Sequence, residues 1–272
     1  MAEFFQGTIP IYDDNDTDNL VGFSGASFGA VARDYDEFPE TMMEHPSGIK
    51  LLDDSAMNAL YDEREARKIG LRYLYLRGGK PAFQNLDQNG QGYCWMYSKV
   101  TAMMAVRMLN NNLPSHPLNA HAPACLVKKG RDEGGWCGLG FDVLRDRGCP
   151  TELTFPRHSM DYRLWNKPEV QEDAAQYRVT EDWYDLTRRE WDQRMTERMI
   201  ATVVMGNVPV AADFMEMAHS MCIIDWVRVE AGSWAPLVLN SWKDWGHYGT
   251  AVIRGRNGKA NTAVAIRNVT SV

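Results

Sequence analysis

Residues 88–109 read QNGQGYCWMYSKVTAMMAVRML, and this stretch decides the fold. Within residues 93–109 the only charges are Lys99 and Arg107, and apolar residues fall on every face of a helix. Such a pattern predicts a helix that is buried all round and runs through the centre of a domain. Cys94 then lies in the first turn, where unpaired backbone N–H groups and the helix dipole favour an anion such as a thiolate.

The overall composition indicates a soluble globular protein. The chain has 272 residues, of which 44% are hydrophobic, enough for one large or two modest domains. No segment approaches the roughly 18 consecutive apolar residues of a membrane span. The first residues, MAEFFQGTIPIYDDNDTD, lack the basic start and apolar stretch of a secretory signal. We therefore expect no membrane contact and no export by the usual route.

The excess negative charge is concentrated at the N-terminal end. The net charge is -7, and residues 1–80 hold 15 acidic and 8 basic residues, so residues 81–272 are balanced. No basic patch stands out along the chain, which argues against nucleic-acid binding. Residues 1–50 show neither helical nor strand periodicity and have the composition of an arm. We interpret the acidic residues as a solvated stretch, with a basic partner as the alternative.

The cysteines and histidines do not suggest a metal site or a disulfide framework. There are five cysteines without a C-x-x-C pair, and no two of the six histidines have a convincing ligand spacing. Asp13 to Asp18 lack the central Gly and terminal Glu of a calcium loop. A reducing compartment is the simplest interpretation, and we predict no metal and no cofactor.

Hydrophobic periodicity predicts that helices come first and strands later. We expect further helices over residues 51–76 and 180–205, with a boundary near Pro81. The expected strands, with a hairpin turn at residues 256–258, cover residues 208–212, 221–230, 236–240, 250–254 and 262–269. This order predicts an α+β fold in which a helical lobe and a β lobe face each other across a cleft.

Four residues spread along the chain suggest nucleophilic catalysis. Gln88 lies six residues before Cys94, and His219 and Asn240 follow Cys94 by 125 and 146 residues. A cysteine becomes a useful nucleophile when a base partner or a helix N-terminus favours its thiolate. In this order and approximate spacing, the four residues resemble those of the papain-like (C1-type) cysteine peptidases.

The resemblance covers about residues 81–255. It implies a papain-like two-lobe fold, in which a helical lobe with the central Cys-bearing helix faces an antiparallel β lobe. It further implies a peptidase domain over residues 81–272, preceded by an N-terminal acidic extension and helix over residues 1–80.

The resemblance also assigns roles to residues of this chain. Cys94 corresponds to the nucleophile, His219 to the base and Asn240 to the residue that orients the imidazole. Gln88, with the Cys94 backbone N–H, corresponds to the site that receives the oxyanion of an acyl-enzyme mechanism. Two tryptophans correspond to the aromatic cover of the Asn–His hydrogen bond: Trp242 and Trp245.

Further landmarks imply a substrate cleft. Gly134 and Gly135 match the glycine pair whose backbone holds an extended substrate, and Trp136 would border the S2 pocket. Met217 is assigned to the same substrate-binding set.

The chain departs from the family pattern at several positions. Gln91 stands where the family has a cysteine, and Tyr93 replaces a small residue before the nucleophile. Asp213 and His219 are separated by much less chain than is usual. Glu63 and Arg67 fit the start of the family's E-x3-R propeptide pattern, but Leu74 stands where that pattern has Asn. We therefore do not expect residues 1–80 to be an inhibitory propeptide.

We expect a cysteine-type peptidase or amide hydrolase that acts on a peptide or protein. The alternative is a structural subunit of a large assembly, such as a bacteriophage virion, that uses the papain-like fold with or without residual activity. Such a subunit would contact its neighbours through residues 1–50. The expected location is cytoplasmic or virion-associated.

Overall fold

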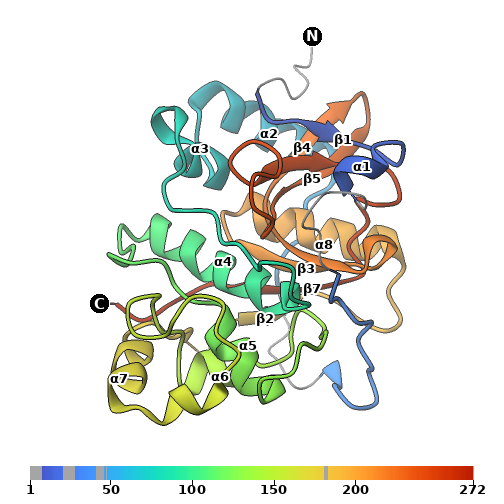
Figure 1. Ribbon diagram of the computed structural model, residues 1–272. Coiled ribbons are helices and arrows are strands. Elements are labelled where there is room, and N and C mark those ends of the chain that lie inside the picture. Colours follow the sequence, from blue (N-terminus) through green and yellow to red (C-terminus); the bar gives the residue numbers. More distant parts are fainter. Residues whose placement is uncertain (1–7, 21–27, 41–45, 47, 181–182, 272) are drawn as a thin grey trace.

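The computed structural model describes residues 8–20, 28–40, 46, 48–180 and 183–271 (Figure 1). Residues 1–7, 21–27 and 41–45 of the predicted arm, and residues 181–182 of a predicted helix, lie outside the described residues.

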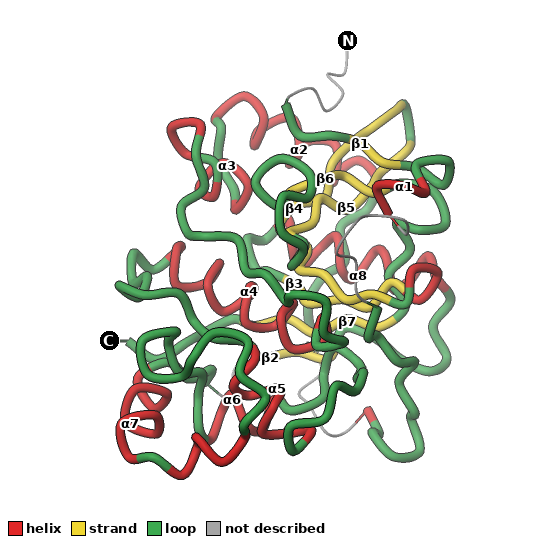
Figure 2. The backbone as a smooth tube through the Cα atoms, in the orientation of Figure 1, coloured by secondary structure: helices red, strands yellow, loops and turns green. Residues whose placement is uncertain are grey.

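Helices and a single sheet share the described chain, as Figure 2 shows. The helices are α1 (Thr17–Leu20), α2 (Asp54–Arg67), α3 (Leu71–Tyr75), η2 (Arg77–Gly79), α4 (Cys94–Leu109), α5 (His121–Lys128), α6 (Phe141–Asp146), η3 (Tyr162–Asn166), α7 (Pro168–Gln176), α8 (Gln193–Met205) and η4 (Met215–Met217). The strands are β1 (Ile11–Tyr12), β2 (Trp183–Asp185), β3 (Val210–Phe214), β4 (His219–Glu230), β5 (Ser233–Leu239), β6 (Thr250–Ile253) and β7 (Thr262–Ile266).

The sheet has the strand order β1-β6-β5-β4-β3-β7-β2. All neighbouring strands are antiparallel except β1 and β6, which are parallel. Both α4 and α8 pack against β3, β4 and β7, and every residue of β3 is buried. Strands covered on both faces are mostly apolar, which explains why β3, apart from Asp213, lacks the alternation of a half-exposed strand.

Helix α4 is the centre of the molecule, as predicted. All its residues except Leu109 are buried, including the charged side chains of Lys99 and Arg107. Lys99 donates from Nζ to the Leu139 carbonyl and lies over the Trp95 ring, 4.8 Å from its centroid. Burial lowers the pKa of Lys99 to about 7. The helix is therefore held from both the sheet and the helical side, which fixes the position of its first turn.

Two predicted helices are shorter than expected. The helix predicted over residues 51–76 is broken between α2 and α3, where Lys68 and Gly70 have φ values of 52° and 118°. In the segment predicted as a helix from residue 180, residues 183–185 form β2 against β7, and α8 begins only after Asp192. The Asp192 side chain accepts a hydrogen bond from Met195 N, a helix start that apolar spacing alone did not reveal.

The hairpin predicted at residues 256–258 is wrong. The chain does turn there, but β6 pairs with β5 and β1, whereas β7 pairs with β3 and β2. Asn261 leads into β7 by donating from its backbone to Asp213 O. The open edge of β3 is thus the partner of β7, a long-range pairing that local turn signals cannot specify.

The described part of the arm is built into the domain. Strand β1 extends the sheet beside β6, with Val252 N donating to Pro10 O at 2.9 Å. Leu20 is 1% exposed, and the Trp245 indole donates to Asn19 O at 2.7 Å. The predicted division into residues 1–80 and 81–272 stays a prediction.

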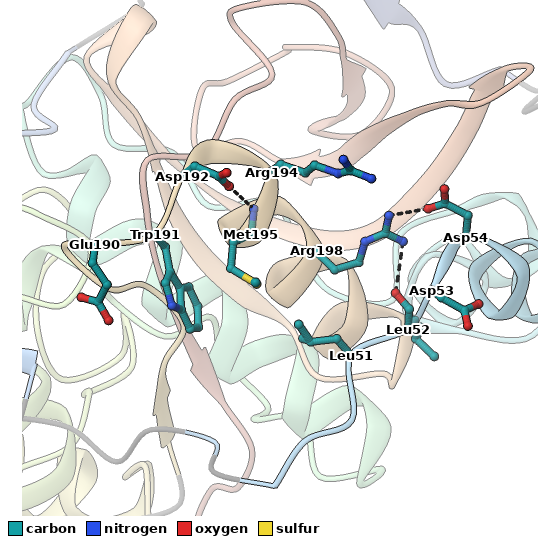
Figure 3. A pocket seen from close by; sticks show the side chains of 10 residues that line it. All are labelled: Leu51, Leu52, Asp53, Asp54, Glu190, Trp191, Asp192, Arg194, Met195 and Arg198. Atoms are coloured by element: carbon teal, nitrogen blue, oxygen red, sulfur yellow. Dashed lines mark hydrogen bonds and ion pairs between the residues drawn. The ribbon is translucent and has the colours of Figure 1, made fainter.

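The chain that follows the arm lies along α8, as Figure 3 shows. Arg198 donates to Leu52 O at 3.1 Å and forms an ion pair with Asp54. A cavity of about 580 Å³ lies between this segment and the start of α8, with Trp191 and Met195 in its wall. Within the described residues, each helix is too short or too polar to cross a membrane.

A buried ion network joins α2 and α3 to the sheet. Asp225 of β4 forms ion pairs with Arg64 and Arg72, both at 3.1 Å, and all three side chains are at most 4% exposed. Breaking a buried ion network leaves uncompensated charge away from water. Residues 54–75 are thus tied to the domain by charge as well as by apolar contacts.

We expect Asp225→Asn to lower the free energy of unfolding by about 3–5 kcal/mol, because the buried guanidinium of Arg64 loses its carboxylate and that of Arg72 keeps only Glu65. Urea denaturation followed by circular dichroism measures this change. The exposed pair of Glu63 and Arg67 provides the control, since Glu63→Gln should cost less than about 1 kcal/mol. Equal losses for the two variants would contradict the role given to the buried network.

Candidate active site

The predicted site residues lie at the first turn of α4 and at the ends of two strands, and Cys94 hydrogen-bonds with Ser220, the residue that follows His219. Cys94 begins α4, His219 begins β4, and Asn240 directly follows β5. His219 Nε2 donates to Asn240 Oδ1 at 2.7 Å. This bond is possible because β4 and β5 are neighbouring strands, with Cys222 paired to Leu239 close to both residues. All three side chains are buried.

Of the two tryptophans assigned to the aromatic cover, Trp242 lies on the His219 imidazole and Trp245 packs against Trp242. The Trp242 ring lies over the imidazole of His219, with 4.4 Å between ring centroids and 31° between planes. Trp245 meets Trp242 edge-on, at 6.2 Å and 89°. Both indoles are at most 2% exposed. Excluding water from a hydrogen bond strengthens it, so the cover holds the imidazole in one orientation.

The thiol of Cys94 lies in a buried polar environment. Burial raises the pKa of Cys94 to about 12, Asp213 adds to the rise, and hydrogen bonds from Ser220 and the Gly29 backbone oppose it. Cys94 is 0% exposed. The thiol is therefore protonated near neutral pH in this state of the chain, contrary to the accessible thiolate that the sequence suggested.

Asp213 connects the elements that surround Cys94. Its carboxylate accepts hydrogen bonds from Thr262 Oγ1 at 2.5 Å, from Cys137 N at 2.9 Å and from the Ser220 hydroxyl. Asp213 also pairs with Ser220 across β3 and β4. A buried carboxylate without such donors would be costly, and with them it ties β3, β4, β7 and residue 137 together.

Gln88 lies in the same site but is engaged in several contacts. Its Nε2 donates to Gln91 O at 2.7 Å, and its Oε1 accepts from Ser241 Oγ at 2.5 Å. Gln88 N also donates to Ser241 O at 3.0 Å. Because Ser241 follows Asn240 and Gln91 precedes Cys94 by three residues, these bonds hold Gln88 between the two halves of the site.

The N-terminal arm crosses this site, which the sequence did not predict. Gly29 N and Ala30 N both donate to Ala218 O, at 3.1 and 2.9 Å, directly before His219. Phe28 meets both the His219 ring and the Trp242 ring edge-on, with centroid distances of 6.4 and 5.9 Å. The arm therefore contributes to the burial of the imidazole and its cover.

The arm pairs with the predicted substrate-binding glycines. Val31 N donates to Gly135 O at 3.0 Å, Gly135 N donates to Gly29 O at 2.8 Å, and Ala30 forms a parallel bridge with Gly135. A Cβ added to Gly134 would lie 2.5 Å from Gly29 O. The glycine pair thus lets an extended backbone approach closely, and here that backbone is the 29–31 segment of the arm.

The other two predicted substrate-binding residues are also covered. Trp136 is 3% exposed and is covered by the Arg33 guanidinium, 4.5 Å from its ring centroid, and by the tilted ring of Phe38 at 5.6 Å. Met217 is 4% exposed, in η4 just before His219. Arg33 is held in place by an ion pair with Asp185 at 2.6 Å, with neither side chain exposed.

Sequence reasoning missed the arm residues, Asp213 and Ser220 as parts of the site. The small residues of the GASFGA run at 25–30 are a signal of close backbone approach, but composition cannot say what they approach. All five cysteines are free and buried. In the part of the chain that the structure describes, no three His, Cys, Asp or Glu residues are grouped as a metal site.

Comparison with solved structures identifies the same architecture elsewhere. Xylellain, a cysteine protease from Xylella fastidiosa, has a TM-score of 0.57 and 13% identity, covering 92% of this chain and 97% of that chain. The bromelain protease from Ananas comosus, in complex with the E64 inhibitor, has a TM-score of 0.53 and 16% identity, covering 75% and 98%. Digestive procathepsin L 3 of Tenebrio molitor has a TM-score of 0.53 and 15% identity, covering 86% and 98%.

These similarities confirm the expected papain-like two-lobe fold. No protein-family model and no curated protein sequence matches the chain. At such low identity the likeness establishes the architecture, and the chemistry has to be argued from the residues described above.

Gly29 offers a way to open the site, because a Cβ there would lie 2.1 Å from Gly92 O. We expect Gly29→Ala to displace the arm. If the Cys94 pKa falls from about 12 toward its ordinary value of 9.0, the thiolate fraction at pH 8 rises roughly 100- to 1,000-fold. Alkylation of Cys94 by iodoacetamide, followed by peptide mass spectrometry, measures this increase.

The pH dependence gives a second readout of the same change. Because the thiol pKa is raised, alkylation of the intact chain should still climb above pH 10, whereas that of Gly29→Ala should level off at lower pH. Val31→Ala is the matched control, since Val31 is 53% exposed and its backbone contacts are kept. Equal labelling rates for all three proteins would refute the covering role of the arm.

Proposed function

We propose that this chain, which has the papain-like cysteine protease fold, is a cysteine peptidase with Cys94 as its nucleophile. The observation that carries the proposal is the hydrogen bond from His219 Nε2 to Asn240 Oδ1 beneath Trp242. His219 begins β4, and β4 packs against α4, the helix that begins at Cys94. An imidazole, an orienting amide and a thiol at a helix N-terminus are the parts that thiol acyl transfer requires.

The hydrogen bond to Asn240 determines which ring nitrogen of His219 can accept a proton. With its proton on Nε2, the neutral imidazole of His219 has its basic lone pair on Nδ1. In the proposed reaction the Cys94 thiol gives its proton to Nδ1, and the thiolate attacks the carbonyl carbon of the scissile amide. The imidazolium then protonates the leaving amine as the C–N bond breaks, and an acyl-enzyme remains. Water hydrolyses the thioester, with His219 taking and returning the proton.

Gln88 is proposed to stabilise the negative oxygen that develops in each tetrahedral intermediate. Its amide N–H and the Cys94 backbone N–H at the positive end of α4 are the donors. With the arm over the site, Gln88 Nε2 donates to Gln91 O, and that hydrogen bond holds the carboxamide in place.

The way the arm is bound supports an extended polypeptide as the substrate. Gly135 exchanges backbone hydrogen bonds with Gly29 and Val31, and such bonds recognise main chain in any sequence. Trp136 would then contact a side chain of the bound peptide, in the way that it now contacts Arg33 and Phe38 of the arm. Although the sequence pattern did not lead us to expect an inhibitory segment in residues 1–80, we therefore propose that the chain as described is a latent form whose own arm occupies the peptide site.

The structural-subunit alternative has less support. It was motivated by an acidic arm that would contact neighbouring subunits. The described arm residues instead contact the chain's own domain through β1, Gly135 and the Arg33–Asp185 ion pair.

Hydrolysis by the opened chain tests the proposal. We expect Gly29→Ala protein to release nitrophenol from nitrophenyl esters of N-acylated amino acids, with an acyl group on Cys94 detectable by mass spectrometry after acid quench. Cys94→Ala or His219→Ala in that background should lower the rate by at least roughly 1,000-fold, because nucleophile and base act as a unit. Asn240→Ala should cost less, roughly 10- to 100-fold, since it only orients the base.

The buried thiol of Cys222, on the same strand as His219, supplies the control. Cys222→Ala should keep the rate within about threefold, because it removes a thiol that the mechanism does not use. Full activity in Cys94→Ala, or an acyl group on another cysteine, would disprove the assignment.

A further inference from the structure

A buried histidine outside the proposed triad is connected to the Gln88 loop. His121 begins α5 and is 0% exposed. Tyr93 and Tyr97 meet its ring edge-on, at 5.2 and 5.5 Å, and the His158 ring lies 5.1 Å away. Its backbone N donates to Asn119 Oδ1 at 3.1 Å. The imidazole is thus fixed from several sides before it contacts the loop.

The loop from Gln88 to Gln91 is a tight turn. Gln91 N donates to Gln88 O at 3.2 Å, and Asn89 and Gly90 have φ values of 51° and 77°. Two successive residues with positive φ, occupied by Asn-Gly, are the signature of a type I′ turn. The turn places the Gln91 carbonyl where it accepts from the Gln88 carboxamide.

The Gln91 side chain joins this turn to His121. Its amide nitrogen lies 2.7 Å from Gln88 O, 2.9 Å from Asn89 O and 3.2 Å from His121 Nε2. An oxygen in that place would face two carbonyl oxygens, so the nitrogen belongs there.

This orientation of the amide fixes the protonation of the imidazole. His121 Nε2 accepts from the amide, and His121 Nδ1–H donates to the Tyr97 hydroxyl oxygen at 2.5 Å. Burial, with His158 and Arg157, lowers the pKa of His121 to about 3, so the ring stays neutral.

We propose that His121 is a positioning residue which, by accepting the Gln91 amide, fixes the turn that aims the Gln88 carboxamide into the site. The inference rests on the proposed function of Gln88 as an oxyanion donor, and it adds a residue that the resemblance does not supply. The physical chain is short: His121 holds the Gln91 side chain, the Gln91 carbonyl holds Gln88 Nε2, and Ser241 holds Gln88 Oε1. Donors aimed in advance stabilise charge without reorganisation in the transition state.

The kinetic test uses the Gly29→Ala background. His121→Leu should lower kcat roughly tenfold while KM changes less than about twofold, because a misaimed donor affects the transition state more than the bound substrate. His121→Gln should restore kcat to within about threefold, since its amide oxygen can accept where Nε2 did. The alkylation rate of Cys94 should be unchanged, because that reaction places no charge on the oxyanion site.

A double-mutant cycle separates positioning from general damage. Gln91→Leu should lose at least as much as His121→Leu, because it also removes the contacts with Gln88 O and Asn89 O, and the double variant should be no worse than Gln91→Leu alone. Additive losses, an unchanged kcat, or an equal fall in alkylation would overturn the proposal. Gln91→Leu also serves if His121→Leu fails to fold.

A readout that needs no catalysis keeps this inference separate from the proposed function. In the intact chain, the ¹⁵N side-chain amide resonance of Gln88 should shift in His121→Leu and Gln91→Leu and return in His121→Gln. If the opened protein hydrolyses nothing yet these shifts occur, the proposed function fails while the positioning stands. Unmoved Gln88 resonances would overturn the positioning.

Discussion

The packing of α4 against β3 and β4 is the constraint on which the rest of the structure depends. A helix without a solvated face must be covered all round, so the sheet, α3 and α5 gather around it. Its N-terminus is thereby carried to the ends of β3 and β4, where the turn at η4 delivers His219. The packing of the core therefore determines where Cys94 and His219 lie relative to each other.

Burying the site requires that the charged groups around it have hydrogen-bond partners within the protein. Lys99 and Asp213 are buried near Cys94, away from water, and hydrogen bonds to other protein groups hold each of them. The same lack of water raises the pKa of Cys94 while the arm is in place. The state of the thiol is therefore set by what lies over the site as much as by the residues within it.

The central helix and the candidate site residues could be predicted from the sequence because two signals are strong. The run of α4 is apolar on every face, and the order and spacing of Cys94, His219 and Asn240 match the family pattern. The strand pairing of β7, the strand β2 and the path of residues 28–31 could not be predicted, since each depends on partners far away in the sequence. The same holds for His121, whose contact with Gln91 crosses from one element to another. Gln91, seen in the sequence only as a missing cysteine, turns out to hold its loop by hydrogen bonds instead.

The arm is fastened on both sides of the stretch that covers Cys94. Before it, β1 and Asn19 are bound to the sheet and Trp245, and after it Arg33 is buried against Asp185. A stretch held at both ends has a high effective concentration at its own site, so in the proposed latent form a soluble peptide would have to compete with it. Severing the backbone between the two fastenings would end that advantage without shedding either piece, and the nicked protein would keep its mass under native conditions.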